Sequence, residues 1–310
     1  MPAGTGFGAA LARALLEPFD DGRPLAFRRL DLPAPRIVML DGREYLAPAD
    51  GTLRELAREA FLELGRFLPQ GRLEALLAAR ASASTEGERL VLDALAANAV
   101  AAAETGLPLC QDTGVASIHA VRGERFLSAS ERGEEAELEL GVADAWRSGG
   151  FRSSLVTPRN LSDESDPGDN LPASVSIRPA VGDSYAFLFA AKGGGSSNKA
   201  ALRQETRALL EPEVFDAFLR DLVEKLGVAA CPPYRIAVAL GGVSPEETLE
   251  AMKLAAAGAF DALPAASASE SPVGALRLRD AEARILELAS GSGWGAQFGG
   301  SRLSRDARVV

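Results

Sequence analysis

Histidine is almost absent from this sequence, because His119 is the single histidine among 310 residues. Zinc hydrolases and Ser-His-Asp hydrolases both place histidine at their reacting centre, so neither class is favoured. Cysteine is nearly as rare: Cys110 and Cys231 are the two in the chain, and they lie far apart in the sequence. They form neither a disulfide framework nor a CxxC zinc pair, and a reducing cytoplasm is the expected location.

Long apolar runs and an excess of basic residues are lacking as well. The densest apolar stretch, Tyr185 to Ala191, has the length of a strand, which excludes a transmembrane helix. The chain has no basic start and meets Asp20 and Asp21 early, which argues against a secretory signal. A net charge of −10 disfavours nucleic acid as a partner. It leaves room for a small anionic substrate, because the local field of a cleft steers such a ligand.

The apolar fraction, 47%, is sufficient for about two packed units or one large one. Residues 1–50 are rich in Pro and Gly and hold two short apolar pieces, 37–40 and 45–46, so they are interpreted as an N-terminal extension. Residues 51–310 are expected to form one continuous unit.

Capping patterns mark the start of several helices. Thr52 with Glu55, and Thr85 with Glu88, fit capping boxes, and Ser244 followed by proline fits an N-cap. We expect helices at 52–68, 72–79, 85–105, 134–146, 214–226, from 245 and at 280–288, and strands at 115–121, 173–177, 185–191, 235–240 and near the end of the chain. The fold class is therefore α+β, with a helical N-terminal block packed on a mixed, largely antiparallel sheet.

Two cysteine-containing segments are candidates for chemistry. Cys110-Gln111-Asp112 follows the end of a long helix, where a cysteine and a carboxylate suit a ligand-plus-acid pair. A buried cysteine with Asp112 capping the turn explains the same residues. Cys231 precedes two prolines that fix φ and would hold it rigidly, and a structural turn before a strand explains them equally well.

The segment KGGGSSNK, from Lys192 to Lys199, would let a ligand approach the backbone closely and offers helix-start amides between two lysines. It lacks the GKS or GKT of a P-loop, and a simple turn is the alternative. Arg152 fits either a solvated arginine or a carboxylate clamp. His119 lies in a strand-like alternation and is expected to be a buried strand histidine.

A set of motifs occurs together from about residue 50 to the last residue. In order they are LCQDTG at 109–114, NLPA at 170–173, AKGGGSSNK at 191–199, ACPPY at 230–234, LGGVSPEETL at 240–249 followed by MKLA, and GAQFGG at 295–300. In order and spacing this set closely resembles the iron–sulfur (class I) fumarate hydratases and the related tartrate dehydratase alpha subunits. The resemblance implies a hydro-lyase that interconverts fumarate and (S)-malate, and it suggests a dimer.

The resemblance also implies roles for particular residues. Cys110 and Cys231 match two of three cysteines that hold a [4Fe–4S] cluster, and Asp112 matches an acid/base residue beside it. The positions that match substrate contacts are Gln111, Arg152 and Gly195. We expect Cys110, Arg152, Gly195 and Cys231 to converge at one cleft.

The implied chemistry suits these residue types. Dehydration of malate removes a proton next to a carboxylate and expels hydroxide, a poor leaving group. An iron in a cluster held by three cysteines keeps open positions and acts as a Lewis acid. A carboxylic acid transfers the proton, while arginine and backbone N–H groups neutralise the charge of the dianion.

The family's third cysteine, and a histidine near the substrate, come after the point where this sequence stops. Residues 51–310 are therefore expected to be an N-terminal catalytic domain, apparently truncated, that works as a homodimer or with a partner chain carrying a C-terminal domain. One alternative is a tartrate dehydratase alpha-type subunit acting on that dicarboxylate. The other is a non-catalytic anion-binding or assembly module that has lost the cluster.

Overall fold

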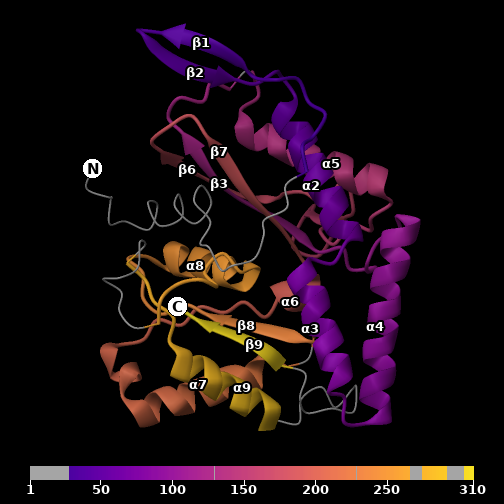
Figure 1. The fold of residues 1–310 in the computed structure, drawn as a ribbon, viewed down its shortest axis with the longest axis vertical. Helices are drawn as coiled ribbons and strands as arrows, with labels where there is room; N and C mark the ends of the chain where they lie inside the picture. The colour runs from indigo at the N-terminus through magenta and orange to yellow at the C-terminus, as the bar shows by residue number, and fades with distance from the viewer. Residues whose placement is uncertain (1–27, 129, 228, 266–273, 292–303) are drawn as a thin grey trace. The chain divides into compact units, whose positions relative to one another are not determined.

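The computed structural model describes residues 28–128, 130–227, 229–265, 274–291 and 304–310 (Figure 1). The chain divides into two compact units. The first unit combines the residues up to 67 with 101–194, and the second combines 68–100 with 195–310. The boundary at residue 50 between an extension and one domain stays a prediction.

A three-stranded mixed sheet organises the first unit. Its central strand is β3 (Val115–Gly123), which runs parallel to β6 (Ser174–Ala180) and antiparallel to β7 (Tyr185–Lys192). Helices α2 (Thr52–Arg66) and α5 (Glu134–Gly149) lie side by side against this sheet (Figure 1). The arrangement confirms the α+β class and the mixed sheet.

The core of the first unit lies between these helices and the sheet. Phe61 of α2 packs against Trp146 of α5 and edge-on against Phe189 of β7, with ring centroids 5.6 and 5.7 Å apart. Gly141 lets the two helices approach closely, because a Cβ there would stand 2.2 Å from the carbonyl oxygen of Arg54. The helical periodicity of the sequence thus buries one face of each helix.

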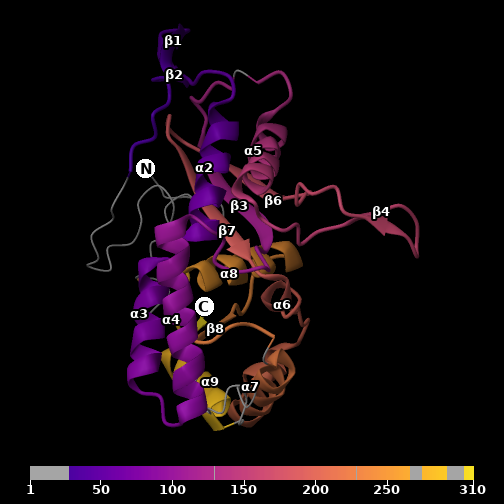
Figure 2. The same ribbon diagram turned by 90° about the vertical axis from the view of Figure 1, so that its right-hand side faces the viewer.

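Two smaller strand pairs complete the first unit. The antiparallel pair β1 (Arg36–Leu40) and β2 (Arg43–Ala47) covers the two apolar pieces noted in the first 50 residues. A second antiparallel pair, β4 (Thr157–Pro158) and β5 (Glu164–Ser165), belongs to a loop that extends away from the sheet (Figure 2).

The second unit is built around two parallel strands, β8 (Tyr234–Val238) and β9 (Ser304–Val309). Its helical elements are α3 (Gln70–Ala81), α4 (Glu86–Thr105, whose last residues belong to the first unit), α6 (Gly194–Ser197, whose first residue also belongs there), η1 (Arg207–Leu210), α7 (Pro212–Leu226), α8 (Pro245–Ala257) and α9 (Arg279–Gly291). Helices α7 and α9 lie on one side of the strands and α8 on the other (Figure 1). Within the described part of the chain, no helix combines the length and apolar character needed to cross a membrane.

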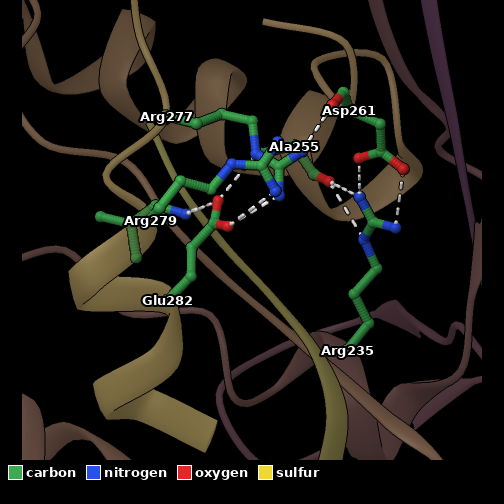
Figure 3. Close-up of polar contacts among 7 residues, drawn as sticks. Arg235, Ala255, Asp261, Arg277, Arg279 and Glu282 are labelled. Atoms are coloured by element: carbon green, nitrogen blue, oxygen red, sulfur yellow. Dashed lines mark hydrogen bonds and ion pairs between the residues drawn. The ribbon is translucent and has the colours of Figure 1, made fainter. Parts of the chain in front are cut away.

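One buried and one partly buried ion pair join the elements of the second unit (Figure 3). The Arg277 guanidinium pairs with the Glu282 carboxylate at 2.7 Å, and the two side chains are 4% and 7% exposed. Glu282 also accepts a hydrogen bond from the backbone N–H of Val309 at 3.3 Å, which links α9 to β9. Arg235 of β8 pairs with Asp261, whose carbonyl accepts from Arg277 at 2.6 Å. A buried charge is tolerated where such partners compensate it.

The helix starts test the capping predictions. Two are confirmed: Thr85 Oγ1 accepts from the N–H of Glu88 at 3.1 Å, and Ser244 Oγ accepts from the N–H of Glu247 at 3.3 Å. The capping box at Thr52 is wrong. Gly51, with φ 77°, is the N-cap, so Thr52 is already helical and its hydroxyl caps nothing.

Of the remaining sequence predictions, some fall on residues that the structure describes and others lie outside them. His119 is buried in β3, and β9 confirms a strand near the end of the chain. The segment at 192–199 does open a helix, but α6 ends at Ser197. The GAQFGG motif at 295–300 and most of the extension at 1–50 lie outside the described residues.

Candidate active site

Three loops meet at one end of the sheet of the first unit. Strands β3 and β6 run parallel, so both begin at this end, and the antiparallel β7 ends there, where Val115 pairs with Lys192. The segments 109–114, 170–173 and 193–194 adjoin these strand ends, which brings three of the sequence motifs together. Gly114 permits the approach, because a Cβ there would stand 2.7 Å from the carbonyl carbon of Lys192.

The carboxylate of Asp112 lies at the centre of this end. Its Oδ1 is 3.1 Å from the hydroxyl of Ser154. Its Oδ2 lies against the glycine backbone, since a Cβ built on Gly193 would be 3.1 Å away and one on Gly194 3.6 Å away. The side chain is half-buried, so a small molecule can reach it while the loops fix its position.

A buried asparagine holds the same loops. Asn170 donates from Nδ2 to the carbonyl of Gly114 at 3.0 Å and accepts at Oδ1 from the N–H of Ser154 at 2.7 Å. The N–H of Gly114 donates to the Ser154 hydroxyl at 3.1 Å. The loops at 112–114, 154 and 170 are therefore connected directly to one another.

A second chain of hydrogen bonds fixes the backbone at Arg152. The indole N–H of Trp146 donates to Thr113 Oγ1 at 3.0 Å, and the Thr113 hydroxyl donates to the carbonyl of Arg152 at 2.5 Å. Trp146 is only 2% exposed, so this chain begins in the core of the first unit. The Arg152 side chain itself is exposed, which leaves its guanidinium available to an anion.

Cys110 and Gln111 lie on the same loop and are both exposed. The N–H of Leu109 donates to the carbonyl of Gly65 at 2.8 Å, which attaches the start of the loop to the end of α2. An exposed thiol next to a fixed backbone is accessible to a metal centre, and of the two readings left open the buried, apolar Cys110 does not hold.

The second unit carries the other two predicted site residues. A Cβ on Gly195 would stand 2.3 Å from the carbonyl oxygen of Ala229, so Gly195 packs against the loop that leads into Cys231. Cys231 is exposed and precedes β8. Burial raises the pKa of the Tyr234 hydroxyl, and the charge of Cys231 raises it further.

The structure thus brings Asp112 together with the loop of Arg152, and Gly195 together with the loop of Cys231. The first group belongs to the first unit and the second group to the second unit. Convergence of all of these residues at one cleft stays a prediction.

The comparisons with known proteins identify the family. A family model described as fumarate hydratase (Fumerase) matches residues 54–310. The chain belongs to the fumarate hydratase family.

The relatives differ in their identity to this chain and in the share of each chain that aligns. "Fumarate hydratase 2" of Leishmania major is 39% identical over 274 residues, which are 88% of this chain and 48% of the relative. "Fumarate hydratase class I, aerobic" of Escherichia coli K12 is 38% identical over 271 residues, 87% of this chain and 49% of the relative. A Methanocaldococcus jannaschii protein provisionally named as an L(+)-tartrate dehydratase subunit alpha is 27% identical over 198 residues, 62% of this chain and 68% of the relative. The chain spans about half the length of the fumarate hydratases it matches.

Sequence reasoning missed three residues that hold the fumarate hydratase motifs in place: Thr113, Ser154 and Asn170. Thr113 and Asn170 stand inside the recognised motifs, but their partners depend on the pairing of β3 with β6 and β7. Asn170 has φ 57°, and asparagine is one of the few non-glycine residues that accept such a conformation. That preference was the one signal available before the structure.

Proposed function

We propose that this chain takes part in the reversible hydration of fumarate to (S)-malate, together with residues outside this sequence. The observation that carries the proposal is the placement of Asp112 among the loops at 152–154, 170 and 193–194. The segments at 112, 170 and 193–194 belong to motifs that resemble the class I enzymes, and the relatives named fumarate hydratase support the assignment.

Asp112 is the proposed acid/base residue. Hydration adds hydroxide to one alkene carbon and a proton to the other, and a fixed carboxyl group serves the proton transfer. The Ser154 hydroxyl and the backbone of Gly193 limit the directions in which the carboxylate can turn. Gln111, exposed on the same loop, is the proposed substrate neighbour.

Arg152 and Gly195 are the proposed groups for the substrate carboxylates. A guanidinium forms two parallel hydrogen bonds with a carboxylate, and Arg152 presents its side chain from a backbone that Thr113 fixes. Because Gly195 has no Cβ, a ligand can approach its backbone closely. Gly194 and Gly195 are the first two residues of α6. Fumarate and malate are dianions, so these contacts match their charge.

The two cysteines are suitable ligands for a [4Fe–4S] cluster, but they supply only two of the three thiolates that hold it. Thiolates are the ligands that iron–sulfur clusters use, and Cys110 and Cys231 are both exposed and are not joined in a disulfide. Within the described ranges, no group of three His, Cys, Asp or Glu side chains is arranged to hold a metal ion. We propose that Cys110 and Cys231 each supply one ligand and that a third comes from outside this sequence. When bound, such a cluster supplies an iron that acts as Lewis acid toward the substrate hydroxyl.

The proposed partner corresponds to the half of the related fumarate hydratases that this chain does not match. Because the matched relatives are about twice as long as the aligned region, we propose that the chain works either as a homodimer or with a partner chain that carries a C-terminal domain. Two cysteines that are not in disulfides and a labile cluster favour a reducing compartment, and the cytoplasm is the proposed location.

The test is anaerobic reconstitution with iron and sulfide of the chain together with the half of the Escherichia coli relative that it does not match, followed by fumarate absorbance and by iron and sulfide analysis. We expect Asp112→Asn to retain the bound iron and lose turnover. Asp183→Asn is the matched control, because this exposed aspartate pairs with Arg125 at the other end of the same sheet. Cys110→Ser and Cys231→Ser are each expected to lower the bound iron. Absence of both iron and turnover in the unmodified chain when that half is supplied would reject catalysis by this chain.

L(+)-tartrate is the alternative substrate, because one relative carries the name of a tartrate dehydratase subunit. Tartrate dehydration is measured on the same preparation as fumarate hydration. Turnover of tartrate without turnover of malate would replace the first proposal. Dicarboxylate binding with neither reaction would favour the non-catalytic anion-binding module.

A further inference from the structure

Gly114, Ser154 and Asn170 form a closed ring of hydrogen bonds in the first unit. The N–H of Gly114 donates to Ser154 Oγ, the N–H of Ser154 donates to Asn170 Oδ1, and Asn170 Nδ2 donates to the carbonyl of Gly114, at 3.1, 2.7 and 3.0 Å. Within the ring, each residue donates once and accepts once. Both polar backbone groups of Gly114 are therefore used, which fixes the end of the Asp112 loop in two directions.

The ring determines what the Ser154 hydroxyl offers to Asp112. A serine hydroxyl has one hydrogen and two lone pairs, and the Gly114 N–H already occupies one lone pair. An ionised carboxylate has no hydrogen to give, so the contact of 3.1 Å is a hydrogen bond donated by Ser154 to Asp112 Oδ1. The serine thus binds the backbone and the side chain of the same loop at once.

Asparagine is the side chain that the third position of the ring requires. Asn170 is fully buried and has φ 57°, a backbone conformation that is unfavourable for most residues with a Cβ. Its amide supplies the acceptor for Ser154 and the donor for Gly114 from one side chain. Aspartate lacks the donor, and glycine adopts the backbone conformation but lacks both groups.

We propose that Ser154, held by Asn170, is a positioning residue that sets the orientation of the Asp112 carboxylate. The inference rests on the proposed function for its catalytic consequence, but its structural part stands independently of turnover. Loss of the Ser154 hydroxyl removes its hydrogen bond to Asp112 Oδ1 and one of the two bonds on Gly114. The carboxylate then turns away from its fixed position, and misplacement of a catalytic group costs up to about 100-fold in rate.

The experiment compares Ser154→Ala with Ser153→Ala and Ser154→Thr in the reconstituted chain. The Ser153 hydroxyl donates to the carbonyl of Leu155 at 2.8 Å and has no bond to Asp112, so Ser153→Ala is the matched control. We expect Ser154→Ala to lower kcat about 10- to 100-fold with KM changed less than about threefold. Ser154→Thr keeps a hydroxyl and is expected to recover most of kcat, which a loss of packing alone would not explain.

Hydrogen–deuterium exchange of peptides covering 109–116 gives a readout that needs no turnover. Ser154→Ala and Asn170→Gly are expected to speed exchange in this segment, while Ser153→Ala leaves it unchanged. Equal kcat and equal exchange in Ser154→Ala and Ser153→Ala would overturn the proposal. If the unmodified chain shows no turnover, the proposed function fails for this chain, and the exchange comparison alone decides whether Ser154 holds the Asp112 loop.

Discussion

Gly195 and Ala229 approach each other so closely that a Cβ on Gly195 would stand 2.3 Å from the Ala229 carbonyl oxygen. Gly195→Ala is therefore expected to displace the loop before Cys231 and to lower the free energy of unfolding by about 1–3 kcal/mol. Gly194→Ala is the matched control, because its Cβ would meet its nearest neighbour at 3.6 Å, an ordinary contact. Urea unfolding measures both variants, and equal stabilities would show that the close approach is not maintained in solution.

The Thr113 hydroxyl joins the core to the Arg152 loop, since it accepts from Trp146 and donates to the Arg152 carbonyl. Thr113→Val keeps the shape of the side chain but leaves the buried indole N–H without its acceptor. We expect a loss of about 1–3 kcal/mol in the free energy of unfolding. Thr113→Ser retains the hydroxyl and should lose less. Thermal unfolding of the two variants tests this order, and a Thr113→Val protein as stable as Thr113→Ser would contradict it.

The sequence predicted what depends on local pattern and missed what depends on strand pairing. The N-caps at Thr85 and Ser244 follow from residue type and spacing alone, and both are present. The helix does start at Thr52 as predicted, but its N-cap is Gly51 and not Thr52, because Gly51 adopts a left-handed conformation that no helical periodicity reports. Ser154 is 42 residues from Asp112 in the sequence, so their contact was not visible before the loops were placed at one end of the sheet.

The buried pair Arg277 and Glu282 is expected to contribute strongly to the stability of the second unit. Glu282→Gln leaves the Arg277 guanidinium without its compensating charge, and breaking a buried pair in this way costs about 3–5 kcal/mol. Arg279 also approaches Glu282, at 3.8 Å, but its side chain is 57% exposed. Arg279→Ala is therefore the control, with an expected loss below about 1 kcal/mol. Chemical unfolding compares the two, and similar losses would refute the special role of Arg277.

Ionisation of Tyr185 is expected to lower the free energy of unfolding at alkaline pH. Burial and the hydrogen bond to Glu134 raise the pKa of Tyr185 in the folded chain above its ordinary value of 10.0. Because the folded pKa is the higher one, the contribution of Tyr185 to stability is complete below about pH 10 and falls as the pH rises further.

Unfolding free energies measured between about pH 8 and pH 11 test this dependence. Tyr185→Phe has no phenol to ionise, so its stability should decline less steeply over this range than that of the unmodified chain. The pKa of Tyr234 is also raised, so a smaller slope is expected to remain. Parallel curves for the two proteins would show that Tyr185 ionises without unfolding.

The pairing of β3 with both of its neighbours has a consequence for length variation in this family. A slip of β3 by one residue would carry Asp112 about 3.3 Å along the sheet and turn the strand's side chains to the opposite faces. An inserted residue between Asp112 and Val115 would have the same effect on the carboxylate. Insertions at the other end of these strands, by contrast, leave the spacing from Val115 to Asp112 intact, so that is where chain length is free to vary.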